Sequence, residues 1–492
     1  MTLDTRSTGI LLHLTSLPGP TWSGTLGSQA LHFVDCLASH HCTLWQMLPV
    51  GPVFFHGSPY ESPSSVAGNP DLLDIEDCVE FVGLSKDKIP QSLNGSASLH
   101  HFRAQLGRLF WSRVLQDASL EQEVMAFVSA QPWLEDFALF MALKHAFDER
   151  AWWEWPAPYR HRNASALSTF RQDHLEVVQQ IYFEQFMFDR QWRYLKTYAE
   201  GQGIRLVGDV PIYVAHDSAD VWSQPELFTL DETGHCIEVA GVPPDYFSET
   251  GQRWGNPLYR WEEHERTGFR WWCQRIEVQR NRFHSLRIDH FRGLEQYWAI
   301  PADAPDGRTG VWRPAAGRAL LQTLTTRFPE LILIAEDLGI ITPEVNALRD
   351  EFGLPGMKIL QFAFDGMPDN PYLPENIVEN SVAYTGTHDN DTLMGWCQSA
   401  PDHILQNAMQ ILGCDRQDLS WAMIGACIHS RAKWSIIPLQ DILGLGSESR
   451  MNTPGTLEGN WQWRFNEQDF NHPGWKQLED CLARDNRAIE SP

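Results

Sequence analysis

Eight short apolar runs, rich in β-branched residues and bounded by Gly or Pro, recur along this chain with helical patterns between them. Such runs are typical of buried parallel strands, and their alternation with helices is typical of α/β folds. Eight of them fit a closed (β/α)8 TIM barrel better than an open doubly wound sheet. The expected strands cover residues 9–14, 44–50, 204–210, 284–289, 331–336, 357–362, 382–386 and 433–439.

Three of the expected helices have clear boundaries. Residues 176–200 carry apolar side chains at helical spacing and stop at Gly201, and residues 268–283 repeat this pattern before the fourth strand. A third helix is expected to begin after Thr342 as its N-cap, with Pro343 in its first turn.

The spacing of the strands is uneven, which indicates insertions in a single catalytic barrel that spans residues 1–492. About 150 residues separate the second strand from the third, far more than one crossover helix needs. We expect residues 81–170 to form a mostly helical insertion there, and residues 215–262 to form a loop-rich insertion after the third strand. After residue 440 no alternating pattern predicts a separate β-domain.

Composition excludes several classes of protein. The net charge is −25, which opposes binding to nucleic acid. No segment has 18 uninterrupted apolar residues, so no membrane span is expected, and the N-terminus lacks the features of a signal peptide. The nine cysteines include no C-x-x-C pair and are interpreted as reduced thiols of a cytoplasmic protein.

The carboxyl ends of three expected strands each deliver an acidic residue. The segments are Arg-Ile-Asp-His at 287–290, Ala-Glu-Asp-Leu-Gly at 335–339 and Thr-His-Asp-Asn at 387–390. In a parallel barrel these ends form the face on which catalysis takes place. Carboxylates beside an Arg and two His indicate sugar chemistry, because retaining cleavage of a glycosidic bond needs a carboxylate nucleophile and a carboxylic acid about 5–5.5 Å away.

Asp289 is the candidate nucleophile and Glu336 the candidate acid/base. Arg287 lies two residues before Asp289, so both side chains face the same way on a strand, and its guanidinium would lower the pKa of Asp289. The alternative is a purely structural Arg–Asp pair. Glu336 follows an apolar run, and such surroundings raise a carboxyl pKa toward the working pH. Asp337 is its competitor, or it binds backbone amides around Gly339 instead.

Asp389 is the third candidate carboxylate, expected to stabilise an oxocarbenium-like transition state and to hold sugar hydroxyls. His388 and His290 can hydrogen-bond the same sugar, although a lone histidine such as His290 is more often a satisfied core residue. Asp209 and Asp217 lie near the end of the third strand and either bind substrate or merely cap turns.

Two loops carry side chains suited to sugar binding. Tyr60 follows the second strand and can stack on a sugar ring. The alternative for both loops is an ordinary surface segment rich in Pro and Gly. The candidates in the second loop, residues 241–259, are Tyr246, Phe247, Gln252, Trp254 and Asn256.

These segments together resemble the 4-α-glucanotransferases of the amylomaltase or disproportionating-enzyme family, within the α-amylase clan. The resemblance spans nearly the whole chain, and the set in this order is highly specific although no single segment is. The segments are HLTSLPGP, SPYESPSSVAGNP, GDVPIYVAHDSADVW, PPDYFSETGQRWGNPLY, RIDHFRG, AEDLG and YTGTHDNDT.

The resemblance implies that Asp289 is the nucleophile, Glu336 the acid/base and Asp389 the transition-state carboxylate, with Asp391 as the alternative to Asp389. It implies a barrel with subdomains inserted between strands and no C-terminal β-sandwich. It also implies that the Trp254 loop covers bound glucan near the acceptor side. The residues that match sugar-contacting companions are Arg287, His290 and His388.

The expected substrates are maltooligosaccharides and other α-1,4-glucans, with glucose as an acceptor, and neither a metal nor an organic cofactor is expected. One rival is an α-glucan hydrolase with the same carboxylates, because water and sugar compete for one intermediate. A second is a glycan-binding protein without catalysis, which would lack one of the three carboxylates. A phosphorylase is disfavoured, since the chain has no Gly-rich phosphate loop or candidate pyridoxal lysine.

Overall fold

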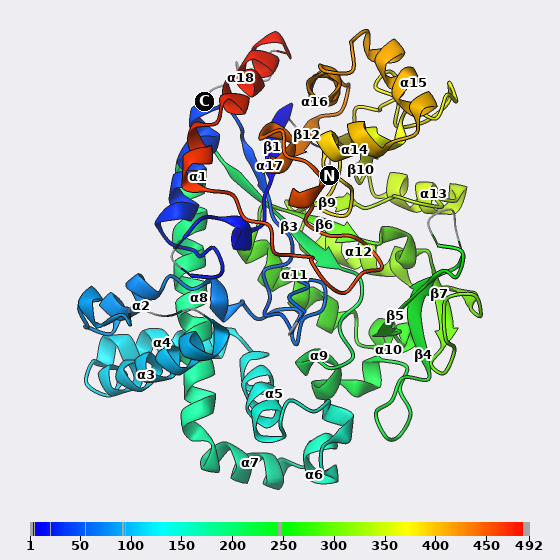
Figure 1. Ribbon diagram of the computed structural model, residues 1–492. Coiled ribbons are helices and arrows are strands. Elements are labelled where there is room, and N and C mark those ends of the chain that lie inside the picture. Colours follow the sequence, from blue (N-terminus) through cyan, green and yellow to red (C-terminus); the bar gives the residue numbers. More distant parts are fainter. Residues whose placement is uncertain are drawn as a thin grey trace.

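The computed structural model describes residues 3, 5–19, 21–54, 56–90, 93, 95–244 and 248–485. It contains the closed barrel of eight parallel strands that the sequence predicts, joined in the order β1-β12-β11-β10-β9-β6-β3-β2 (Figure 1). Each barrel strand overlaps one predicted run. The strands are β1 (Ser7–Leu11), β2 (Leu44–Gln46), β3 (Arg205–Pro211), β6 (Ser285–Asp289), β9 (Ile332–Ala335), β10 (Gly356–Ile359), β11 (Ser381–Tyr384) and β12 (Trp434–Pro438).

Two apolar layers hold the barrel together. The interior is filled by a small cluster of buried side chains from alternating strand positions, among them Val207, Ile334 and Tyr384, while a much larger cluster joins the strands to the surrounding helices. The helices that follow or flank the barrel strands are α1 (Ser28–Ser39), α8 (Leu175–Gly201), α11 (Arg270–Arg282), α12 (Gly317–Arg327), α13 (Pro343–Glu351), α14 (Leu393–Ser399), α15 (Asp402–Leu412), α16 (Leu419–His429), α17 (Leu439–Ile442) and α18 (Pro473–Asp485).

The predicted helix boundaries agree with α8, α11 and α13. Thr342 has the extended backbone of an N-cap and Pro343 begins α13, but the Thr342 side chain makes no capping hydrogen bond. Thus Pro343, whose ring presets the helical φ, marks this helix start without help from a side-chain cap. No helix in the described part of the chain combines the length and the apolar character needed to cross a bilayer.

In the described part of the chain, six α-helices lie between β2 and α8, the helix that leads into β3. The longer ones pack beside the N-terminal half of α8, where Phe110 contacts Phe183 and Phe186 with ring centroids 5.1 and 5.4 Å apart. The six helices are α2 (Ile75–Phe81), α3 (Ser96–Val114), α4 (Ala118–Ala130), α5 (Leu134–Ala146), α6 (Ala157–Arg160) and α7 (Ala164–Asp173).

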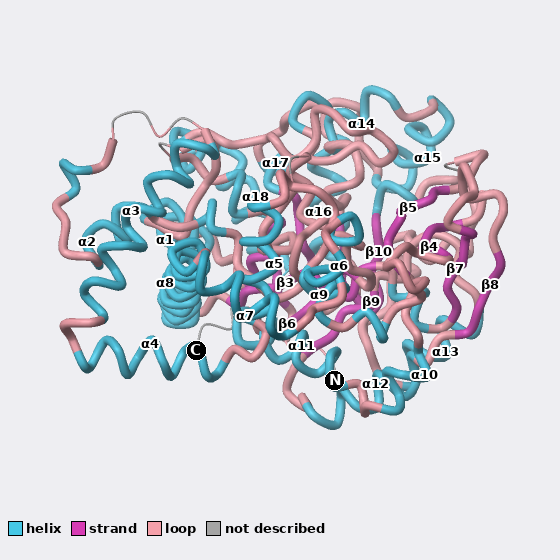
Figure 2. Tube along the Cα trace, turned by 90° about the horizontal axis from the view of Figure 1, so that it is seen from below, coloured by secondary structure: helices cyan, strands magenta, loops and turns pink. Residues whose placement is uncertain are grey.

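A four-stranded antiparallel sheet, which the sequence analysis did not predict, lies across the barrel from α2, α3 and α4 (Figures 1 and 2). Its order is β5-β4-β7-β8. The segment expected to be loop-rich supplies two of its strands, and the connection after β6 supplies the other two. The strands are β4 (Glu238–Val242), β5 (Gln252–Pro257), β7 (Gln296–Pro301) and β8 (Val311–Pro314).

The sequence does not reveal this sheet, because the central pairing that joins its two halves is long-range. β4 pairs with β7, with Ala240 opposite Ala299 and Gly241 opposite Trp298. Gly241 also faces β5 so closely that a Cβ atom there would lie 2.1 Å from the Gln252 carbonyl oxygen. A short strand with an internal glycine carries little local β signal, and neighbouring strands provide what stabilises it.

A buried ion pair joins the helices between β2 and β3 to the loop after β3. The Lys144 ammonium lies 2.6 Å from Asp217 Oδ2 and also donates to the carbonyls of Glu149 and Arg150. The side chain of Lys144 is 4% exposed. Beside this pair, Trp153 stacks on His216 with ring centroids 3.8 Å apart. Asp217 therefore has a structural partner.

We predict that Lys144→Met lowers the free energy of unfolding by roughly 3 kcal/mol, because it leaves a carboxylate and two carbonyls without their donor. Chemical unfolding followed by circular dichroism measures the shift. The matched control is Lys86→Met, which removes a pair to Glu76 whose two side chains are 51% and 57% exposed. It should change stability by less than about 1 kcal/mol. Equal effects of the two substitutions would contradict a structural role for the buried pair.

Candidate active site

Strand alternation aims several polar side chains into the barrel mouth. Val207 and Ile334 fill the barrel interior, so Asp209 and Glu336, each two residues further along, face the same space. The register pairs Ile288 on β6 with Ala335 on β9. Asp289 and Glu336 are the next residues, and they therefore stand at one level on neighbouring strands, which lie about 4.8 Å apart in a sheet.

Arg287 is the centre of the charge network at this mouth. Its Nη1 atom lies 2.6 Å from Asp209 Oδ2, and its Nη2 atom lies 2.8 Å from Asp289 Oδ1. Tyr60 donates its hydroxyl hydrogen to Asp209 at 2.8 Å. Burial alone would lower the pKa of Arg287, but Asp209 and Asp289 raise it well above its usual value. A permanent positive charge is thus fixed against both aspartates.

Glu336 is held by two backbone amides. The N–H of His290 donates to Oε2 at 2.7 Å, and the N–H of Leu338 donates to Oε1 at 3.1 Å. His290 has a left-handed backbone with φ of 52°, which is uncommon for a residue other than glycine. Burial raises the pKa of Glu336 to about 8, a shift that Arg287 opposes and Asp289 supports.

Asp337, the alternative candidate for the acid/base, binds groups outside the mouth of the barrel. Its Oδ1 atom accepts the Met357 N–H at 2.7 Å, and its Oδ2 atom pairs with Arg349 on α13. Asp337 binds a backbone amide, as one alternative expected, but the amide belongs to β10 and not to the turn around Gly339.

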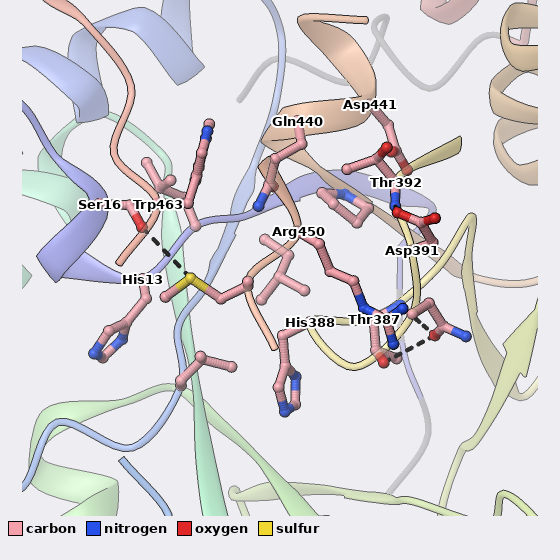
Figure 3. A pocket seen from close by; sticks show the side chains of 16 residues that line it. His13, Ser16, Thr387, His388, Asp391, Thr392, Gln440, Asp441, Arg450 and Trp463 are labelled. Carbon is pink, nitrogen blue, oxygen red and sulfur yellow. Dashed lines mark hydrogen bonds between the residues drawn. The ribbon is translucent and has the colours of Figure 1, made fainter. Parts of the chain in front are cut away.

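Asp389 and Asp391 face different spaces. Asn452 donates to Asp389 Oδ1 at 2.6 Å, and His388 Nε2 lies 3.4 Å from the same oxygen. Asp391 instead accepts the Ser447 hydroxyl at 2.7 Å and lines a small pocket behind the turn, in which Asp389 has no part (Figure 3). Only Asp389 is therefore placed with the charge network at the mouth.

The segment at 447–465, here named the strap, brings residues to the mouth that the sequence analysis missed. Arg450 extends to the turn at Thr387, as Figure 3 shows, and donates to the Asp389 carbonyl at 2.5 Å. The N–H of Asn452 donates to the His388 carbonyl at 3.0 Å. The strap has no helical or strand period, so no local signal marks it.

Aromatic rings flank the carboxylates on both sides. Tyr60 and His388 stack with ring centroids 5.2 Å apart and an angle of 11° between their planes. The Trp254 ring, which is 38% exposed, meets the His290 ring edge-on at 4.8 Å. Burial lowers the pKa of His290 to about 4, so its imidazole is neutral at physiological pH.

The other candidates of the loop at 241–259 have varied positions. Gln252 accepts the indole N–H of Trp254 at 2.9 Å, which orients that ring. Asn256 donates to the Val214 carbonyl at 2.9 Å and so fastens β5 to the loop after β3. Tyr246 and Phe247 lie outside the described residues. Among the residues that are described, no three His, Cys, Asp or Glu side chains form a group able to hold a metal ion.

Comparisons with known proteins show the family of this chain. The profile of the 4-alpha-glucanotransferase family matches residues 12–469. A 4-alpha-glucanotransferase of Thermus thermophilus is 47% identical over 475 residues, which cover 94% of this chain and 95% of the relative. A chloroplastic/amyloplastic 4-alpha-glucanotransferase of Arabidopsis thaliana is 41% identical over 94% of this chain and 81% of its own length.

Among solved structures, the amylomaltase of Streptococcus agalactiae in complex with acarbose superimposes with a TM-score of 0.93 at 36% identity. That comparison covers 98% of this chain and 99% of the other. The chain described here belongs to the 4-alpha-glucanotransferase family.

Proposed function

We propose that this protein is a retaining 4-α-glucanotransferase in which Asp289 is the nucleophile, Glu336 the acid/base and Asp389 the transition-state carboxylate. The observation that carries the proposal is the placement of Asp289 and Glu336 at one level on neighbouring strands. An inter-strand spacing of about 4.8 Å is compatible with the separation of about 5–5.5 Å between carboxyl groups that retaining enzymes need.

The environments of the two carboxyls differ in the way that the reaction requires. Arg287 lies 2.8 Å from Asp289 and holds its carboxyl oxygen at the barrel mouth. Glu336 is half-buried, which raises its pKa to about 8, and it is therefore protonated at neutral pH. A carboxyl paired with a fixed guanidinium, beside a carboxyl that is protonated at neutral pH, fits the roles of nucleophile and acid.

In the first half-reaction, Glu336 gives its proton to the glycosidic oxygen while an oxygen of Asp289 bonds to the anomeric carbon. The reducing-end fragment leaves with a free 4-hydroxyl. Glu336, now ionised, then takes the proton of an acceptor's 4-hydroxyl, and that oxygen displaces Asp289. Two inversions at one carbon give net retention.

The expected substrates are maltooligosaccharides and longer α-1,4-glucans, with glucose able to serve as the acceptor. We infer that Asp389 and His388 hold hydroxyls of the sugar at the reacting carbon, with the Tyr60 ring, which stacks on His388, beside them. A cytoplasmic location stays a prediction of the sequence.

We predict that maltotriose yields glucose together with maltooligosaccharides longer than the substrate. Transfer makes one glycosidic bond for each that it breaks, so the concentration of reducing ends should stay nearly constant while the products spread. Chromatography of the oligosaccharides with a parallel reducing-end assay measures both. A steady rise in reducing ends without longer products would show a hydrolase that uses the same carboxylates.

We predict that kcat/KM for maltotriose falls about tenfold per pH unit above pH 8, because the acid must be protonated to act. The protonated form of Glu336 predominates below its pKa of about 8 and is lost above it. The control substrate is maltotriosyl fluoride, whose leaving group needs no proton, so the first half-reaction should lose this basic limb. A limb that persists with the fluoride would assign it to another group.

We predict that Asp389→Asn lowers kcat/KM on the order of 100-fold or more, because it removes a charge that faces the developing cation. Asp391→Asn is the matched control, since that carboxylate binds Ser447 behind the turn. It should cost less than about tenfold. The reverse order, measured on maltotriose at equal folded protein, would exchange the roles of the two aspartates.

A further inference from the structure

A second tryptophan stands at the mouth, away from Trp254. The ring centroid of Trp461, on the strap, lies 5.9 Å from that of Tyr60 and 5.8 Å from that of His388. The indole is half-buried, and the sequence analysis did not select it as a candidate. It thus extends the aromatic surface formed by Tyr60 and His388.

The backbone of Trp461 is left-handed, with φ of 64°. This conformation costs about 1–2 kcal/mol for a bulky residue and nothing for glycine. The Trp461 N–H donates to the Met451 carbonyl at 2.7 Å, and the N–H of Thr453 donates to Asn460 Oδ1 at 2.9 Å, so paired hydrogen bonds close the base of this loop. Backbone strain of this size in a residue at the edge of the site indicates that the indole ring has a function of its own.

Both ends of the strap are fastened, which fixes the ring in place. On one side, Asn452 binds the Asp389 carboxylate at 2.6 Å. On the other, the Arg464 guanidinium donates to the carbonyls of Leu17 and Thr21, at 2.7 and 2.6 Å. A platform that is rigid before the substrate arrives loses little entropy on binding.

The acid/base tells the two sides of the site apart. The leaving oxygen must lie next to Glu336, whose carboxylate is bound by the His290 N–H, and Trp254 packs on the His290 ring. Trp254 is therefore on the leaving-group and acceptor side. Trp461 packs instead on His388, next to Asp389 and Tyr60, where the transferred part of the donor must lie.

We propose that Trp461 is a stacking platform for the donor glucan, contacting a sugar on the non-reducing side of the transferred glucosyl unit. This inference rests on the proposed transfer reaction. Flat indole faces suit the C–H faces of glucose rings, and the neighbouring Tyr60 and His388 rings continue the surface toward the reacting carbon. Trp461 would then set the preference for longer donors.

The test compares three fluoride donors of increasing length with Trp461→Ala. Glucosyl fluoride carries only the transferred sugar, whereas maltosyl and maltotriosyl fluorides also carry sugars on its non-reducing side. We expect kcat/KM for maltotriosyl fluoride to fall roughly tenfold, with glucosyl fluoride nearly unchanged. Trp461→Phe should restore most of the length preference. An equal loss for all donors would overturn the proposal and leave Trp461 a packing residue.

Two further variants keep the result interpretable. Trp461→Gly removes the ring in a residue that accepts the left-handed backbone without strain, so it separates the loss of stacking from a distorted loop. Gln462→Ala changes the exposed neighbour on the same strap and should leave every donor unchanged. If Trp461→Gly keeps the full preference for longer donors, the proposal is wrong.

Trp254→Ala tests the acceptor side of the site, whereas Trp461→Ala tests the donor side. It should weaken the use of added glucose as acceptor and raise the share of hydrolysis, while the donor-length preference stays intact. If Trp254→Ala and Trp461→Ala alter donor length alike, the assignment of sides is overturned. If the wild-type protein releases fluoride from no donor, the proposed function is wrong. If the wild-type protein reacts equally well with donors of every length, only the proposal for Trp461 is wrong.

Discussion

The contacts of Arg287 are the constraint on which the rest of the site depends. Arg287 is 4% exposed, and its guanidinium binds Asp209 on β3 and Asp289 on its own strand. Removing one partner of such a buried group leaves an uncompensated charge and costs about 3–5 kcal/mol. Arg287 is therefore stable in this position only when both Asp209 and Asp289 are present. This ion-pair network fixes the orientation of the Asp289 side chain.

Closure of the barrel brings the charged side chains of this site together. Because β3, β6 and β9 are neighbours in the barrel, Asp209, Asp289 and Glu336 converge on one space. The strap then adds Asn452 from a distant part of the chain and binds Asp389 to the same mouth. Backbone amides of His290 and Leu338 hold the Glu336 carboxyl group in position beside them.

The sequence predicts the barrel and its carboxylates because both leave a local signal. Each strand is an apolar run, and each acid follows at its end. The antiparallel sheet and the strap leave no such signal, since Gly241 pairs with Trp298 and Asn452 binds Asp389, partners far along the chain. Position after a barrel strand does not by itself place a residue in the site. Asp217 lies near the end of a barrel strand, yet its carboxylate pairs with Lys144.

Tyr60 and Trp254 show how much a residue's chemistry alone can predict. Both were expected to offer rings to a sugar, and both lie beside the charge network, but Tyr60 also binds Asp209 through its hydroxyl and stacks on His388. Asn256, chosen from the same loop as Trp254, uses its amide to fasten β5. A side chain's type predicts what it can bind, and only the fold shows what it does bind.

The most direct test of the account is to trap the covalent intermediate. The Glu336→Gln variant should react with maltotriosyl fluoride, because fluoride leaves without a proton, and should then stall, because no base activates the acceptor. Mass spectrometry of the quenched protein should show one added maltotriosyl group, and peptide mapping should place it on Asp289. A glycosyl group on another carboxylate, or turnover without any adduct in this variant, would contradict the assignment of Asp289 as nucleophile.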